Sequence, residues 1–538
     1  MPVERNSAFL KATQARRYFA LILHAHLPFV RHPEQEYFLE EDWLFEALTE
    51  TYLPLLGMMY RLAEEGRPFC LTMSLTPTLG AMLRDSLLQR RYLHHLERLI
   101  GLARQEIERN RNDAHLCELS GFYAQLFTDT RTFYVEKLGC DVVRAFRELQ
   151  DAGYLEIVAS AATHPFLPLL QDFPEAQRAQ VLIGCESYRE MFGRSPIGFW
   201  LPECGYSAGL DSLLQAADIR WFVLDMHGLM FAQGQPQQAV FAPCYTPAGP
   251  AVFARDSESN RAVWSAESGY PGEPAYRDFY RDIGFDRSPE ELAPFLRPPG
   301  VRKFSGIKYH RVTGRAEKEL YDRRRAAAAA EAHADDFFQK CCARFQNLGG
   351  VSFDPLLVSP FDAELFGHWW FEGPLFLENF IRRVTRETAE FQLVSPGQFL
   401  HEHPLQQIVR PSPSSWGEHG FSSVWLDEKN AWIYRHLHAA TRRMTELARR
   451  YRETTDPMID RTLKQAAREL LLAQASDWAF LIKTNSAPDY ATQRTKNHLL
   501  RFNRFHEQLG SGGVDFDFLG ECEEQANLFP NLNWRHFL

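Results

Sequence analysis

Residues 18–28 read YFALILHAHLP, an apolar run that ends in two histidines and a proline. A short apolar run with polar residues at its end is typical of a strand buried on both faces, as in a parallel sheet. His24 and His26 are two residues apart, so on a strand their side chains lie on the same face. The stretch therefore predicts a buried strand with imidazole groups at its carboxyl end.

Five further apolar runs end in the same way. Run 69–73 is followed by Ser74 and Thr76, run 155–162 by Thr163 and His164, run 197–201 by Glu203, run 221–224 by Asp225, and run 356–358 by Asp362 and Glu364. Helical stretches separate many of the runs, which indicates a parallel sheet covered by helices on both faces. Polar residues at the ends of such strands are typical of a (β/α) barrel, whose active site lies at that rim.

The rest of the chain suggests a division into domains. We expect a catalytic barrel in residues 1–400 and a helical C-terminal domain, contributing to the cleft, in residues 401–538. Within the barrel, about 79–146 has helical periodicity and is interpreted as an insertion. About 207–255 has clusters of Gly and Pro and is interpreted as a lid or a small loop-rich subdomain.

Composition limits the classes of function. The net charge of -10 argues against sequence-independent binding to nucleic acid, which needs a basic face. The nine cysteines have neither disulfide-framework nor metal-ligand spacing, which favours a reducing, cytoplasmic setting. The polar stretch Met1–Arg17 has no apolar segment of a signal peptide, and no apolar run is long enough to span a membrane.

Glu203 is the first candidate for chemistry. The apolar run 197–201 breaks at Pro202, and a carboxylate follows directly. A carboxylate at the end of an apolar strand is costly unless it is paired or used. Glu203 is therefore a candidate nucleophile, and the alternative is an ordinary acid near the start of a helix.

A second concentration of acids lies in residues 359–374, SPFDAELFGHWWFEGP. Glycosidases use two carboxylates, one as acid/base and one as nucleophile or base. Asp362 can partner Glu203, while Glu364 and Glu372 compete for that role and spacing alone does not choose among them. The alternative is an ordered loop packed on its own aromatic side chains.

Histidines and tryptophans could complete a site. His24 and His26 could bind a metal with His164 and Asp362, bond to a sugar, or be satisfied core histidines. Four tryptophans occur in polar contexts and together indicate an extended cleft for a polymer, although each alone is more often a core residue: Trp264, Trp416, Trp425 and Trp478.

Seven motifs carry a resemblance to a known family. They are HAHLPFV (24–30), GYLEIVASAATHPFLPLL (153–170), WLPECG (200–205), WSAESGYPG (264–272), SPFDAELFGHWWFEGP (359–374), SSWGEHG (414–420) and ASDWAFLI (475–482). In this order and over nearly the whole chain, the sequence resembles glycoside hydrolase family 57, and within it the enzymes that branch α-1,4-glucans.

The resemblance implies a (β/α)7 barrel with an inserted subdomain and a C-terminal helical domain. It also implies a retaining mechanism without a metal or other cofactor, in which Glu203 is the nucleophile and Asp362 the proton donor. The substrate contacts it implies are Arg255, Gly272, Trp416, Asp477, His24, His26, His164 and Trp264. Trp425 and Ser486 complete the predicted binding residues.

The implied reaction is cleavage of an α-1,4 linkage in amylose or a glycogen-type polymer and transfer of the chain to a 6-hydroxyl, which forms an α-1,6 branch. An α-amylase or a 4-α-glucanotransferase could use the same carboxylates. A metal-dependent barrel hydrolase and a non-catalytic glucan-binding protein are the alternatives from other classes.

Two positions depart from the branching enzymes that the sequence resembles. Ser486 stands where those enzymes tend to carry Gln, and Pro236-Gln237-Gln238 stands where their lid loop tends to present a Tyr. Because that loop is thought to shield the glycosyl-enzyme from water, the departures bear on the balance between transfer and hydrolysis.

Overall fold

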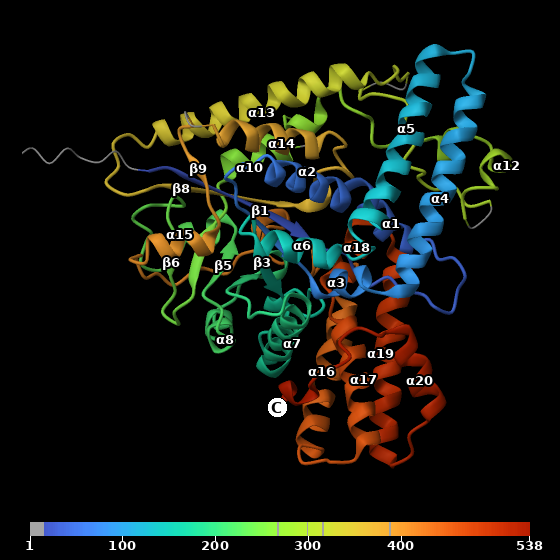
Figure 1. The fold of residues 1–538 in the computed structure, drawn as a ribbon. Coiled ribbons are helices and arrows are strands. Elements are labelled where there is room, and N and C mark those ends of the chain that lie inside the picture. The colour runs from blue at the N-terminus through green and yellow to red at the C-terminus, as the bar shows by residue number, and fades with distance from the viewer. Residues whose placement is uncertain (1–15, 266–267, 298–299, 315–316, 387–388) are drawn as a thin grey trace, which may run out of the picture.

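The computed structural model describes residues 16–265, 268–297, 300–314, 317–386 and 389–538 (Figure 1). Most of the N-terminal stretch Met1–Arg17 lies outside these residues, as do Ala266 and Glu267 of the WSAESGYPG motif. Within the described part, no helix is both long and apolar enough to cross a membrane.

A curved sheet forms the centre of the molecule. Its strands are β1 (Tyr18–Ala25), β2 (Leu71–Leu75), β3 (Leu155–Ser160), β4 (Gly198–Trp200), β5 (Trp221–Leu224), β6 (Cys244–Tyr245), β7 (Ala251–Ala254), β8 (Leu356–Asp362) and β9 (Gln392–Leu393). The order is β6-β7-β5-β4-β3-β2-β1-β8, with β9 beside β1, and only the β6–β7 pair is antiparallel. This sheet confirms the predicted (β/α)7 barrel.

The barrel closes between β7 and β8 without a strand ladder. The backbone N–H of Asp256, just after β7, donates to the carbonyl of Val358 in β8 (2.8 Å), and the Asn260 amide donates to the carbonyl of Pro360 (2.6 Å). Because the long strands are parallel, their carboxyl ends all lie at one rim of the barrel. At that rim His24 lies in register with Ser74 on one side and Asp362 on the other.

The side chains of β1 alternate between two cores, as a strand buried on both faces requires. Tyr18, Ala20 and Ile22 belong to the cluster inside the barrel, whereas Phe19 and Leu21 pack in the larger cluster under the helices. His24 continues the inward series at the rim, where its ring stacks on Trp200 at 4.5 Å. The core inside the barrel therefore ends at the imidazole ring of His24.

Helices surround this sheet and extend beyond it. In the N-terminal half they are α1 (Glu41–Ala47), α2 (Leu53–Glu64), α3 (Pro77–Leu83), α4 (Ser86–Arg109), α5 (Ala114–Thr132), α6 (Val142–Asp151), α7 (Pro174–Phe192), α8 (Leu210–Ala216), α9 (Met226–Met230) and α10 (Ser257–Trp264). In the C-terminal half they are α11 (Ile283–Asp286), α12 (Pro289–Leu292), α13 (Arg323–Gln346), α14 (Gly373–Val384), α15 (Pro396–Glu402), α16 (Trp432–Arg450), α17 (Pro457–Ala473), α18 (Ser476–Thr484), α19 (Pro488–Ser511) and α20 (Phe516–Gln525).

Local sequence explains where the long helices begin. The side chains of Asp85, Asp322 and Asp456 accept hydrogen bonds from the first free backbone N–H groups of α4, α13 and α17. Such caps satisfy donors that have no partner inside a helix. Helix α7 ends at Gly193, which has a φ of 69° and so takes the left-handed conformation that glycine tolerates best.

Two helical parts project from the barrel (Figure 1). Helices α4 and α5 form an antiparallel hairpin between β2 and β3, and helices α16, α17, α19 and α20 form a bundle on another side, with the short helix α18 beside the barrel. Residues 207–255 contribute β5 and β7 to the sheet in addition to their loops.

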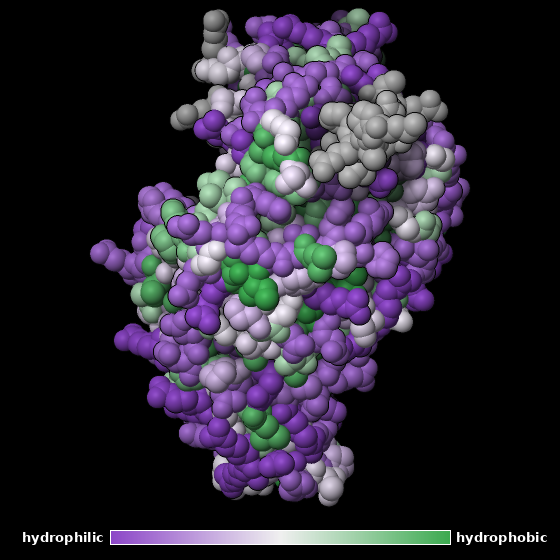
Figure 2. Space-filling view, turned by 90° about the vertical axis from the view of Figure 1, so that its left-hand side faces the viewer, coloured by the Kyte–Doolittle hydropathy of each residue, from purple (hydrophilic) through white to green (hydrophobic). Residues whose placement is uncertain are grey.

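The face drawn in Figure 2 is largely hydrophilic, with apolar side chains only in small separate patches.

Candidate active site

A cavity of about 1060 Å³ opens at the carboxyl rim of the barrel. Eleven of the predicted site residues line it: His24, His26, His164, Glu203, Arg255, Trp264, Asp362, Trp416, Trp425, Asp477 and Ser486. Gly272 does not, because it lies in the short turn Tyr270–Gly272 away from the lining. The barrel and the C-terminal bundle both contribute, since Asp477 and Ser486 come from α18 and the residues just after it.

Glu203 lies on a strained turn directly after β4. The turn Pro202–Cys204 holds Glu203 at a φ of 62° and Cys204 at 48°, in the left-handed region that residues other than glycine seldom adopt. Such a conformation costs about 1–3 kcal/mol and persists only where surrounding contacts impose it. One such contact is the backbone N–H of Trp416, which donates to the Glu203 carbonyl at 3.0 Å.

The Glu203 carboxylate accepts two hydrogen bonds. The indole Nε1–H of Trp416 donates to Oε2 at 2.9 Å, and the hydroxyl of Ser476 donates to Oε1 at 2.8 Å. Burial raises the pKa of Glu203, and the two donors oppose that rise by stabilising the anion. The two donors therefore offset part of the effect of burial and stabilise the charged form of this partly exposed carboxylate.

Asp362 is the last residue of β8 and has a different environment. Within the described residues, no hydrogen bond or ion pair reaches its carboxyl group. Burial, followed by the charges of Glu364 and Glu203, raises the pKa of Asp362 well above the ordinary value. The surroundings of Asp362 therefore favour its protonated form, whereas the two hydrogen-bond donors on Glu203 favour the anion, as an acid beside a nucleophile requires.

The two competing carboxylates are held by other partners. Glu364 lines the cavity, but its Oε1 accepts from the hydroxyl of Tyr52 and from the backbone N–H of His26. Glu372 lies outside the lining and accepts from the hydroxyl of Tyr321 at 2.7 Å. Asp362 is thus the carboxyl group of this segment that lines the cavity without an internal partner.

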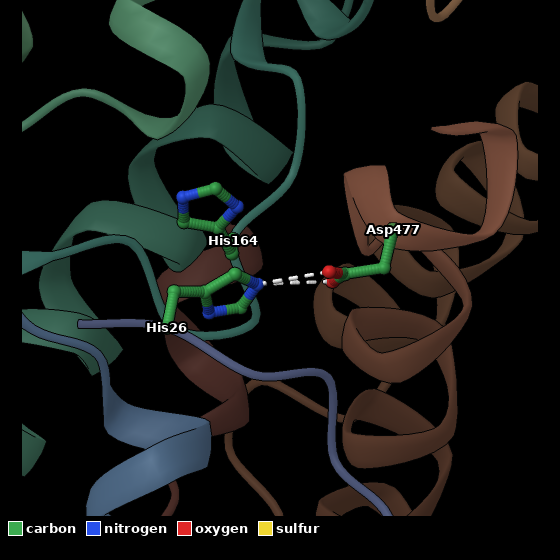
Figure 3. Close-up of side chains that lie close together, drawn as sticks. All are labelled: His26, His164 and Asp477. Atoms are coloured by element: carbon green, nitrogen blue, oxygen red, sulfur yellow. Dashed lines mark hydrogen bonds and ion pairs between the residues drawn. The ribbon is translucent and has the colours of Figure 1, made fainter. Parts of the chain in front are cut away.

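Three histidines fill the rim beside Glu203. His26 Nε2 lies 3.0 and 3.1 Å from the two oxygens of Asp477, and its Nδ1 lies 3.0 Å from the hydroxyl of Thr76 (Figure 3). Burial opposes the charged form of His26, but the Asp477 carboxylate outweighs it and raises the pKa of His26. Burial lowers the pKa of His24 and of His164 well below the usual value, so these two rings are neutral.

The histidines suit hydrogen bonding better than metal binding. His26, His164 and Asp477 are close enough together to share an ion, but the rings of His26 and His164 are stacked at 3.8 Å with 19° between their planes. Imidazole lone pairs lie in the ring plane, so two stacked rings do not point at one ion. Both nitrogens of each ring also have hydrogen-bond partners already.

The hydrogen bonds form a directional chain that ends on Glu203. Because Ser476 gives its proton to Glu203, the Nδ1–H of His164 must donate to Ser476 (3.1 Å). His164 Nε2 must then accept from His24 Nε2–H (3.0 Å), and His24 Nδ1 accepts from Ser74 (3.0 Å). Sequence reasoning placed Ser74 at a strand end but gave it no role, and it missed Ser476, whose one signal is its place beside Asp477.

The remaining predicted residues form the walls. Arg255 is ion-paired with Asp225 at the end of β5, and Trp264 leaves about half of its surface exposed. Trp425 is buried and stacks on Phe166 at 4.2 Å, and Trp478 is a core residue whose indole donates to the carbonyl of Leu472.

The loop expected to act as a lid is hydrogen-bonded to Gln407. The backbone N–H of Gln237 donates to the side chain of Gln407 at 2.8 Å, and Gln407 in turn donates to the carbonyls of Gly234 and Gln235. None of the described residues 231–240 lines the cavity.

Comparisons with known proteins agree with this geometry. The sequence profile of glycosyl hydrolase family 57 matches residues 20–412, and that of the 1,4-alpha-glucan branching enzyme C-terminal domain matches residues 436–537. The 1,4-alpha-glucan branching enzyme TK1436 of Thermococcus kodakarensis is 32% identical over 95% of this chain and 77% of its own length.

Two solved structures have the same fold over nearly their whole length. The alpha-amylase AmyC from Thermotoga maritima has a TM-score of 0.90 and 42% identity, over 98% of this chain and 99% of its own. The GH57-type branching enzyme from Pyrococcus horikoshii has a TM-score of 0.87 and 33% identity, over 97% of each chain. Since the family profile covers most of the chain and relatives match it end to end, this chain belongs to glycosyl hydrolase family 57.

Proposed function

We propose that this protein is a 1,4-α-glucan branching enzyme that works by a retaining double displacement, with Glu203 as nucleophile and Asp362 as acid/base. The observation that carries the proposal is the contrast between the two partly buried carboxyl groups on one rim. Trp416 and Ser476 stabilise Glu203 as an anion, whereas Asp362 has no such partner among the described residues and its surroundings favour the protonated form. Retaining glycosidases need this division of labour.

In the first step Glu203 attacks the anomeric carbon of an α-1,4-linked glucose. The bond to the glycosidic oxygen breaks while Asp362 transfers its proton to that oxygen, so the departing chain leaves as a neutral alcohol. The products are a glycosyl ester on Glu203 and an ionised Asp362. The loss of the negative charge on Glu203 also removes one of the charges that raise the pKa of Asp362.

In the second step a 6-hydroxyl of another glucan chain attacks the ester. Asp362 now accepts the proton of that hydroxyl, Glu203 leaves as a carboxylate, and an α-1,6 branch is formed with the anomeric configuration retained. Water in place of the sugar hydroxyl would give hydrolysis. Branching therefore depends on which nucleophile occupies the Asp362 side of the cleft.

The relatives support a glucan as substrate. TK1436 and the Pyrococcus horikoshii protein are both named as branching enzymes, and the C-terminal profile that matches residues 436–537 is named for branching enzymes too. The cavity, with Trp264 and Trp416 in its walls, offers the aromatic surface that the apolar faces of sugar rings contact.

An α-amylase is the second candidate, because AmyC matches this chain with higher identity than TK1436 or the Pyrococcus horikoshii enzyme does. Two observations are in line with it. Ser486 at the cavity wall is short, and the loop carrying Gln237 is tied to Gln407 and lines no part of the cavity. Both features leave the glycosyl-enzyme more open to water.

Incubation with amylose distinguishes the two. The proton NMR spectrum should show new α-1,6 linkages, and these should exceed the new reducing ends counted in the same sample. Reducing ends without α-1,6 linkages would refute branching and leave the amylase assignment. Glu203→Gln protein serves as the control for contaminating activity.

A further inference from the structure

The cavity continues well beyond the catalytic pair. Away from Glu203 it is lined by residues that the family motifs do not assign: Glu46 of α1, Phe279, Lys303 and Phe304 of the segment between β7 and α13, and Trp369 of the loop after β8. A second arm of the cleft therefore lies between α1 and these two loops.

Three aromatic rings form a supported platform in this arm. Trp369 is 53% exposed and stacks on Phe279 with ring centres 4.4 Å apart and 28° between the planes. Phe304 lies 5.4 Å from Phe279, and the ammonium of Lys308 lies 4.3 Å from the Phe279 ring and 4.6 Å from the Phe304 ring. Because stacking and cation–π contacts hold these rings, the free surface of Trp369 is preorganised to receive an apolar face.

Glu46 supplies an unpartnered polar group to the same arm. Its acidic neighbours are satisfied: Asp42 is ion-paired with Lys303, and Glu50 lies 2.7 Å from His368 Nδ1. Within the described part of the chain, Glu46 has no hydrogen bond or ion pair, although it lines the cavity. Burial, followed by the charges of Glu50 and Asp42, raises the pKa of Glu46 well above the usual value. Its carboxyl group can therefore both donate and accept.

The arm lies on the Asp362 side of the cleft. Trp369 follows Asp362 in the loop after β8, and that loop is tied to the turn after α1 by His368 and Glu50. Gly367 allows this close approach, since at its φ of 119° an added Cβ would lie 1.8 Å from the Glu50 carbonyl oxygen. The acid/base of a retaining enzyme faces the departing chain first and the incoming nucleophile second.

We propose that the platform of Trp369, Phe279 and Phe304, together with Glu46, is a binding subsite for the acceptor glucan chain; this rests on the proposed transfer function. A glucose ring presents an apolar face to Trp369 and hydroxyl groups to Glu46, so one ligand satisfies both features. Occupation of this subsite brings a sugar hydroxyl to Asp362 and displaces the water that would hydrolyse the glycosyl-enzyme.

The test measures the reaction with the donor separately from transfer to the acceptor. α-Maltosyl fluoride serves as donor, because fluoride release reports formation of the glycosyl-enzyme, and maltoheptaose serves as acceptor. Trp369→Ala and Glu46→Ala should each raise the maltoheptaose concentration for half-maximal transfer about tenfold, from the loss of one aromatic or polar contact. Fluoride release without acceptor should change less than about twofold.

Two conservative variants guard against a general structural effect. Trp369→Phe keeps a ring, and Glu46→Gln keeps a group that donates and accepts, so both should restore much of the acceptor affinity. Phe516→Ala is the matched control, since Phe516 is 52% exposed on α20, outside the cavity. Equal melting temperatures for all variants show that each is folded.

An unchanged acceptor dependence in Trp369→Ala and Glu46→Ala overturns the subsite. If the parent protein transfers to no acceptor at all, the proposed function has failed and the subsite is judged by binding instead. Calorimetry then compares maltoheptaose affinity of Glu203→Gln protein with and without Trp369→Ala. A tenfold loss supports a glucan subsite there, and equal affinities overturn it.

Discussion

The ends of β4 and β8 carry the same chemical group in opposite surroundings. Glu203 follows β4 on a strained turn and receives hydrogen bonds from Trp416 and Ser476. Asp362 ends β8 in regular strand geometry and receives none from the described residues. The comparison teaches that the protein distinguishes two partly buried carboxyl groups through their neighbours, since burial raises the pKa of both.

The origin of the difference is tertiary. The turn at Glu203 carries its carboxylate toward the bundle, where Ser476 begins α18, and toward the 414–420 segment, which supplies Trp416. Asp362 instead shares its part of the rim with Glu364, whose charge adds to that of Glu203 in raising the pKa of Asp362. Hydrogen-bond donors therefore lie beside Glu203, whereas the carboxylate of Glu364 lies beside Asp362.

The largest expected effect comes from removing the nucleophile. Glu203→Ala should lower the rate on amylose by about 10⁴-fold or more, because no other group can form the ester. Added azide should restore turnover of α-maltosyl fluoride by direct displacement and give the β-glycosyl azide. An α-glycosyl azide from this variant would reverse the roles given to the two carboxyl groups.

Removing the acid should have a smaller effect that depends on the leaving group. Asp362→Ala should lower the rate on amylose by about 10²- to 10⁴-fold. Fluoride needs no protonation to leave, so fluoride release from α-maltosyl fluoride should fall much less, as a single-turnover burst will report. Equal losses on amylose and on the fluoride would contradict an acid role for Asp362.

The smallest effect concerns the hydrogen bond that distinguishes the two ends. Glu203 must be ionised to act, so activity is lost as pH falls through its pKa. Trp416→Phe removes a donor that lowers this pKa, so the acid limb of the kcat/KM profile should move to higher pH. Trp425→Phe is the control: Trp425 lines the same cavity, but its Nε1 has no partner among the described residues. If the acid limb of Trp425→Phe moved to the same extent, the shift in Trp416→Phe would not come from the loss of the hydrogen bond to Glu203.

Much of the barrel could be predicted from local pattern. The run 18–23 lies in β1 (Tyr18–Ala25) as expected, because a continuous apolar run followed by His24 and His26 suits a strand buried on both faces. The run 155–162 also forms a strand, although it ends at Ser160, so that His164 lies in the following turn at a φ of 56°. Periodicity shows that an element exists, but not where side-chain contacts end it.

The part of the site that sequence reasoning missed consists of residues without an unusual local context. Ser476 contacts Glu203 from a helix 273 positions away, and Glu46 looks like an ordinary acid of an amphipathic helix until the cavity is seen. Gly272 lies in the turn Tyr270–Gly272, and a contact between it and the substrate stays a prediction.

By itself the sequence determined the alternation of strands and helices, the rim on which polar residues gather, and the family, since each depends on short-range pattern or on long motifs in order. Only the tertiary structure decided which carboxyl group receives hydrogen bonds, that the three histidines stack and that His24 and His164 continue the hydrogen-bond chain to Glu203, and that the cleft has a second arm with Glu46 and Trp369. The physical reason is that pKa values, ring contacts and cavities depend on groups far apart in the chain, which meet only when the barrel closes and the bundle packs against its rim.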